Sequence, residues 1–132
     1  MSDEALRKIV YDGGCLLEVE ERRFESATGF VTTIRLVFEK LRAHVIAMPD
    51  DDTVAIRFDP LPDDHDSVAV PSTQREPWIR VRGCDCTWAW LLTNQQGYTD
   101  GLRLEFRTDS GSHVVEMIVA ASQFTYHDFV AA

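Results

Sequence analysis

The chain has 132 residues, of which 45% are hydrophobic and 27% are charged, and its formal net charge is −9. This length suits one domain, and the composition is typical of a globular protein with one core. The charge has the wrong sign for neutralising phosphates, so it argues against nucleic acids and anionic membranes as partners. It is compatible with a basic protein partner, and in the alternative interpretation it only keeps the protein soluble.

The first residues predict a short helix. Ser2 can cap a helix over residues 3–11, which has acidic residues in its first turn and apolar residues on one face. Gly13-Gly14 then ends it. This start lacks the basic and apolar stretches of a signal peptide, and no run approaches the roughly 18 apolar residues of a membrane span. We therefore expect a cytoplasmic protein.

The first half of the chain then predicts four strands. Apolar residues alternate with other residues around positions 15–19, 34–38, 44–48 and 54–58. The expected inner residues of the first strand are Cys15, Leu17 and Val19. His44 shares a face with Ile46 in the third strand.

Residues 59–77 break this pattern and form an acidic, proline-rich connector. Such a segment is expected to be exposed and mobile.

The second half predicts four more strands. Residues at positions of equal parity are expected to share the inner face of the first of these strands: Cys84, Cys86, Trp88, Trp90 and Leu92. A polar loop follows over residues 93–101, and the later strands carry Leu104, Phe106 and His113 on their inner faces.

The two halves resemble each other. Residues 14–58 are echoed by residues 83–129, with Leu36 matching Leu104 and His44 matching His113. Repeats at a fixed spacing indicate a duplicated architecture, here within one domain over residues 1–132. Two unrelated hairpins with alternating apolar residues are the alternative explanation.

These elements predict a mainly β fold that borders on α+β. It is an antiparallel meander of about eight strands in two similar halves, preceded by a short N-terminal helix. The pattern leaves a sandwich, a barrel and a single sheet open.

The sequence contains no pattern that specifically indicates a metal site or a catalytic site. Cys84-x-Cys86 has no second cysteine pair, so burial in the core is favoured over zinc. The acidic runs 50–52 and 63–66 lack the spacing of a calcium loop. His44 and His113 can act as a functional pair or simply satisfy the backbone of a turn. We expect no metal and no cofactor, name no catalytic residue, and favour a protein that is not an enzyme.

The polar loop over residues 93–101 is the best candidate for a binding site, because loops on a rigid scaffold commonly carry binding. The candidate residues are Trp90, Asn94, Gln95, Gln96, Tyr98 and Asp100. In the alternative interpretation Asn94 and Asp100 only stabilise the turn through the backbone.

The stretch Trp88-x-Trp90-x-Leu92-x-Asn94-Gln95-Gln96-Gly97-Tyr98-x-Asp100-Gly101, followed by Leu104-x-Phe106, resembles a small family of uncharacterised bacterial proteins. The resemblance covers mainly residues 78–126. It implies a small, stand-alone cytosolic protein and brings no assigned activity with it.

Two functions therefore stay open. The first is a non-enzymatic protein-binding module that engages a partner, in particular a basic one, through the 93–101 loop and an acidic surface. The second is a small-ligand-binding domain or enzyme with a pocket near that loop. A flat aromatic surface favours the first, and a concave pocket with convergent polar groups favours the second.

Overall fold

The computed structural model describes residues 3–61 and 66–131. Ser2, the expected helix cap, and most of the acidic run 63–66 lie outside the described residues. The chain begins with α1 (Asp3–Arg7), which continues as one π-helical turn, η1 (Lys8–Asp12). Leu6 and Ile9 are buried on the inner side of this segment, as the sequence predicts.

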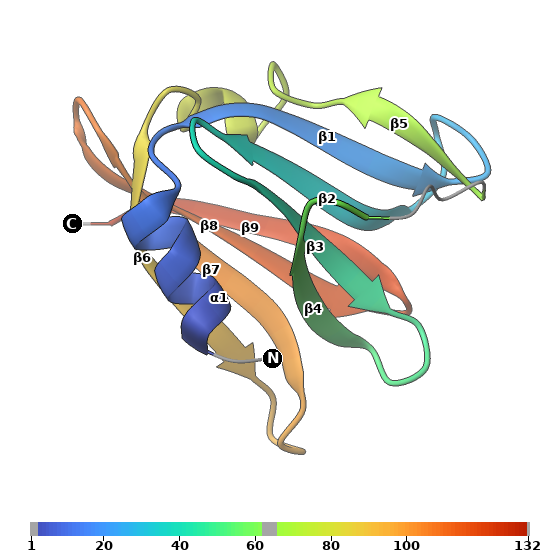
Figure 1. The fold of residues 1–132 in the computed structure, drawn as a ribbon. Coiled ribbons are helices and arrows are strands. Elements are labelled where there is room, and N and C mark those ends of the chain that lie inside the picture. Colours follow the sequence, from blue (N-terminus) through green and yellow to red (C-terminus); the bar gives the residue numbers. More distant parts are fainter. Residues whose placement is uncertain (1–2, 62–65, 132) are drawn as a thin grey trace.

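The strands form two antiparallel sheets (Figure 1). The five-stranded sheet has the order β4-β3-β2-β1-β5, and the four-stranded sheet has the order β6-β7-β8-β9. The strand bounds are β1 Leu16–Phe24, β2 Val31–Phe38, β3 Arg42–Met48, β4 Thr53–Phe58, β5 Ser67–Pro71, β6 Asp85–Thr93, β7 Thr99–Thr108, β8 Gly111–Ala120 and β9 Gln123–Ala131. The prediction of a mainly β, antiparallel fold with a short N-terminal helix is confirmed.

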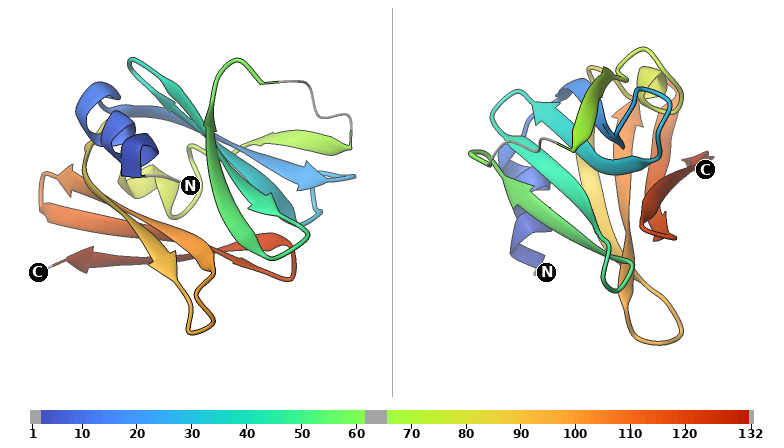
Figure 2. Two further views of the ribbon diagram at one scale, coloured as in Figure 1. Left: turned by 60° about the horizontal axis from the view of Figure 1, so that its bottom comes forward. Right: turned by 90° about the vertical axis from the view of Figure 1, so that its right-hand side faces the viewer.

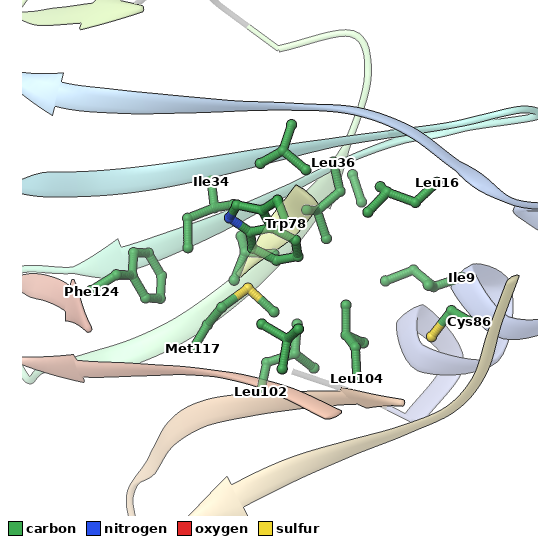
Figure 3. Packing of buried hydrophobic residues seen from close by; sticks show 14 of the residues in the cluster. Ile9, Leu16, Ile34, Leu36, Trp78, Cys86, Leu102, Leu104, Met117 and Phe124 are labelled. Atoms are coloured by element: carbon green, nitrogen blue, oxygen red, sulfur yellow. The ribbon is translucent and has the colours of Figure 1, made fainter. Parts of the chain in front are cut away.

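The two sheets face each other across one hydrophobic core (Figure 2). Trp78, from a single 3₁₀ turn (η2, Trp78–Arg80), is fully buried and lies between the layers (Figure 3). It is surrounded by aliphatic side chains from both sheets, including Ile34, Leu36, Leu102 and Met117. Since each sheet buries one face in this core, its other face points outward.

The connector contains a strand that the sequence did not reveal. Ser67–Pro71 forms β5, which pairs antiparallel with β1 from Glu20 to Phe24. The described residues therefore contain nine strands rather than about eight. The segment is short and ends in a proline, and both features favoured a loop. It is a strand because β1 otherwise presents an unpaired edge, whose backbone groups β5 satisfies.

Bulges at two places changed the predicted faces of strands. The register of β1 shifts between Leu16 and Glu18, and that of β6 shifts between Cys86 and Trp88. A bulge adds one residue to one strand, so the alternation of faces reverses beyond it. The prediction that Leu17 faces inward is wrong for this reason, since Leu16 is buried and Leu17 is exposed.

The two four-stranded units, β1–β4 and β6–β9, follow the same sequential antiparallel order. Their central hairpins, β2–β3 and β7–β8, have two-residue turns at positions 39–40 and 109–110. Counted from these turns, His113 corresponds to Ala43 and Phe106 to Leu36, so the predicted matches of His113 with His44 and of Leu104 with Leu36 do not fit the strand register. The common ancestry of the halves stays a prediction.

Candidate functional site

The outer face of the four-stranded sheet is largely apolar. Cross-strand pairing arranges its side chains in three rows. From β6 to β9, the rows are Trp88-Glu105-Val114-Phe129, Trp90-Arg103-Glu116-His127 and Leu92-Gly101-Ile118-Thr125. We call these twelve residues the aromatic face. A solvent-facing side of an antiparallel sheet usually carries polar residues, so six large apolar side chains on one such face are unusual.

The bulge in β6 creates this surface. Cys86 remains in the core, but Trp88 is 59% exposed and Trp90 is 39% exposed. The prediction that both tryptophans share the inner face with Cys86 is therefore wrong. Beyond the bulge, Ala89 and Leu91 take the inward positions and pack against the core.

The aromatic side chains are held in place by one another and by an arginine. The rings of Trp88 and Trp90 stack with their centroids 6.2 Å apart. The guanidinium carbon of Arg103 lies 5.7 Å from the centre of the Trp90 ring and 6.0 Å from that of Phe129. Both distances fit cation–π attraction.

Arg103 is itself anchored by a buried carboxylate. Its Nη2 lies 2.5 Å and its Nε 2.6 Å from Oε2 of Glu116, which is largely buried. Two donors of Arg103 thus share one carboxylate oxygen, which holds the guanidinium group in place. The aromatic face is thus preorganised, which lowers the entropy cost of binding.

Glu105 is the second carboxylate of this face. It stands between Trp88 and Val114 in its row and is half-buried. Among residues 3–61 and 66–131, its side chain has no salt bridge. A carboxylate without a salt bridge among the described residues therefore lies between two apolar side chains of its row.

The polar loop projects from the β6–β7 hairpin (Figures 1 and 2). Asn94 closes it: its Oδ1 accepts hydrogen bonds from the backbone N–H groups of Gln96 (2.9 Å) and Tyr98 (3.2 Å). The Nδ2 of Asn94 also donates to Asp100 at 3.3 Å. Asn94 therefore holds the turn through the backbone, whereas Asp100 contacts only the side chain of Asn94 among the hydrogen bonds of this loop.

The other predicted loop residues, Gln95, Gln96 and Tyr98, are exposed. Trp90 belongs to the aromatic face rather than to the loop, so the structure divides the predicted site between two surfaces.

A cavity opens on the other sheet. It has a volume of about 590 Å³ and opens on the outer face of β1–β4. No residue of the 93–101 loop lines it or the two smaller cavities of about 380 and 340 Å³. The prediction of a pocket near that loop thus finds no counterpart in these cavities.

The two histidines with matching sequence contexts lie on different faces. His44 points outward into this cavity and is 2.5 Å from Oδ1 of Asp59. His113 lies on the core side of β8, where its Nε2 is 2.8 Å from Oδ2 of Asp128. The two histidines lie on different sheets, and each contacts its own aspartate, so they do not form a joint site.

Three potential metal ligands meet where the sheets join. One ligand atom each of Cys15, Glu39 and Asp85 lies within 4.8 Å of the others. The hydrogen bond with Glu39 is the main cause that raises the pKa of the Cys15 thiol. A metal binds the thiolate, so this arrangement favours the form that does not bind.

The chain belongs to a family of unknown function, DUF6334, whose model matches residues 4–132. No curated protein and no solved structure matches the chain. Membership in this family assigns no activity to the aromatic face or to the cavity.

Proposed function

We propose that the chain is a non-enzymatic protein-binding module whose aromatic face binds a basic protein partner. The observation that carries this proposal is the exposure of Trp88 and Trp90 on a preorganised outer sheet face. Tryptophan and arginine are enriched among the residues that dominate the energy of protein interfaces. The face combines both, with Phe129 completing the apolar surface.

The charge of the face supports a partner that presents arginine or lysine. Glu105 offers a carboxylate without a salt bridge among the described residues, and the rings of Trp88 and Trp90 offer faces for cation–π contacts. The net charge of −9 adds long-range attraction for a basic protein. An acidic partner would be repelled by Glu105 and by the net negative charge of the chain.

The proposal includes a bacterial source and a cytoplasmic location. Lys8 and Lys40 are the only lysines among the 13 basic residues, and this preference for arginine is typical of a GC-rich bacterial genome. All three cysteines are free thiols, which suits a reducing compartment.

The proposal is tested by enriching partners from an extract of the source organism with immobilised wild-type protein and with the double variant Trp88→Ala/Trp90→Ala. Tyr11→Ala, which removes an aromatic residue that is 78% exposed outside the aromatic face, is the matched control. We expect a basic protein that wild type and control retain and the double variant loses.

The retained protein is then purified and its dissociation constant measured by calorimetry. Truncating a residue at the centre of an interface costs about 2 kcal/mol or more, so Trp88→Ala should weaken binding by at least about thirtyfold. Equal affinity of wild type and Trp88→Ala would refute the proposal. Sedimentation can also show that the wild-type chain forms a dimer that Trp88→Ala dissociates. In that case the partner is a second copy of this chain, and a basic heterologous partner is excluded.

A further inference from the structure

The structure carries a second site on the outer face of β1–β4, away from the aromatic face. There, cross-strand pairing aligns Glu20, Arg35, His44 and Arg57 in one row across four strands. All four side chains line the cavity of about 590 Å³. This volume is in the range of small-molecule pockets.

Three arginines meet in this cavity, although the chain as a whole is acidic. Arg22, Arg35 and Arg57 line it together with the carboxylates of Glu20 and Asp59. Among the described lining residues, three guanidinium groups against two carboxylates leave one net positive charge, before His44 is counted. The described lining of the cavity therefore carries a net positive charge, whereas the chain as a whole is negative.

The two carboxylates are already engaged by the protein. Asp59 accepts a hydrogen bond from His44 and lies 3.9 Å from Arg35 and 3.8 Å from Arg42. The bond from His44, followed by the nearby arginines, holds the pKa of Asp59 below its ordinary value. Glu20 lies 3.7 Å from Arg22 and 4.0 Å from Arg35.

Two donor groups are left over. Arg57 is exposed at the end of the row and has no salt bridge or hydrogen bond with its side chain among the described residues. The Nε of Arg35 is buried and has no hydrogen-bond partner within that same part of the chain. Buried donors are nearly always satisfied, and this one belongs to a residue that lines the cavity.

Apart from Thr33, the other described residues of the lining are apolar. Ile46 and Met48 follow His44 on the same face of β3, and Leu61 comes after β4. The cavity thus presents cationic donors beside an aliphatic surface.

We propose that this cavity binds a small organic carboxylate that has an apolar body. The carboxylate group pairs with Arg57 and Arg35, whose planar guanidinium groups match its geometry. The apolar body covers Ile46 and Met48. One negative charge balances the net charge of the lining, whereas a phosphate dianion would add a second charge close to Glu20 and Asp59. The site is independent of the proposed partner surface.

The test is a titration followed by calorimetry and by amide NMR shifts, with hexanoate, hexanamide, acetate and inorganic phosphate as probes. We expect saturable hexanoate binding with shifts centred on β2, β3 and β4. A hydrogen bond to a charged group is worth about 1.5–3 kcal/mol, so hexanamide should bind at least about tenfold more weakly. Acetate should also bind more weakly, because it lacks the apolar body.

Arg57→Gln tests the cationic partner, and its exposure means that the fold should tolerate the change. We expect about a tenfold loss of hexanoate affinity. Arg80→Gln removes an exposed arginine that pairs with Glu76 and does not line the cavity, so it should bind like wild type.

Equal binding of hexanoate and hexanamide, an equal loss in both arginine variants, or no saturable binding at millimolar hexanoate would each overturn the proposal. Phosphate binding that is tighter than hexanoate binding would overturn the choice of a carboxylate. None of these outcomes bears on the aromatic face, since Trp88 and Trp90 lie on the other sheet.

Discussion

At the scale of single residues, Asn94 shows how one amide can define a turn. Its backbone N–H donates a hydrogen bond to the carbonyl of Tyr98 at 2.9 Å. Its side-chain oxygen accepts two further hydrogen bonds from backbone N–H groups. Gly97 adopts a φ of +87°, which favours glycine. Asn94 and Gly97 therefore determine the shape of the turn. The side chains of Gln96 and Tyr98 are exposed and do not hold it in place.

Asn94→Ala should lower the free energy of unfolding by about 1 kcal/mol, because two exposed backbone donors of the turn then exchange their side-chain acceptor for water. Gln96→Ala and Tyr98→Ala should each change it by less than about 0.5 kcal/mol, since both side chains are exposed. Urea denaturation measures all three. If Gln96→Ala and Tyr98→Ala lowered the free energy of unfolding as much as Asn94→Ala, their side chains would also hold the turn, contrary to this prediction.

The cysteines differ in their surroundings, although all three are free. Burial raises the pKa of the Cys86 thiol to about 12, and its side chain is only 3% exposed. Cys15 and Cys84 are half-buried.

In native protein, an alkylating reagent such as iodoacetamide should modify Cys15 and Cys84 well before Cys86, because the reagent needs an accessible thiolate. Peptide mass spectrometry at increasing reaction times gives the order. The same reaction in urea is the control, where all three should react at similar rates. Early modification of Cys86 in native protein would place it outside the core.

At the scale of elements, a hydrogen bond from Tyr126 to the buried carboxylate of Glu21 ties the two sheets together. Glu21 of β1 is 3% exposed and pairs with Nη2 of Arg23 at 2.6 Å. Its other oxygen accepts a hydrogen bond of 2.6 Å from the hydroxyl of Tyr126 in β9. Burial, and then the charge of Glu21, raise the pKa of Tyr126.

A tyrosine whose pKa is higher in the folded than in the unfolded state stabilises the protein fully below its unfolded pKa, near 10. That contribution is lost as the pH rises above this value towards the folded pKa. The unfolding free energy of wild type should therefore fall above about pH 10 more steeply than that of Tyr126→Phe. Near pH 7, Tyr126→Phe should cost about 1–3 kcal/mol, because Glu21 loses a hydrogen bond.

Urea denaturation from pH 8 to pH 11 tests this expectation, with Tyr98→Phe as the control at an exposed tyrosine. The control should keep the steep fall of wild type. Parallel curves for wild type and Tyr126→Phe would rule out the proposed link between Tyr126 and Glu21.

Elements were predictable where alternation is regular. The helix at the N-terminus and the strands β2, β3, β7 and β8 follow from periodic apolar residues, because each buries one face in a common core. The faces of Leu17 and Trp88 were not predictable, since a bulge leaves no mark in the residue types and reverses the parity. β5 was missed because its pairing with β1 is not local.

At the scale of the whole molecule, the two outward faces differ in chemistry. One is aromatic around Arg103, and the other is a concave row of charges around His44. The aromatic face could not be found from the sequence, because its rows join residues from β6 to β9 and need the register of all four strands. The alternation of residues along each strand places the arginines of the cavity on the outer face. Their meeting in one cavity follows only from the order of the strands in the sheet.

The central claim is that the aromatic face is the surface that binds the partner. The most direct test is the amide NMR spectrum of labelled protein titrated with the purified basic partner. We predict that shifts concentrate at residues 88–92, 103–105, 114–118 and 125–129, and that Trp88→Ala abolishes them at the same partner concentration. Shifts centred on the turn at residues 94–98, or on the outer face of β1–β4, would contradict the claim.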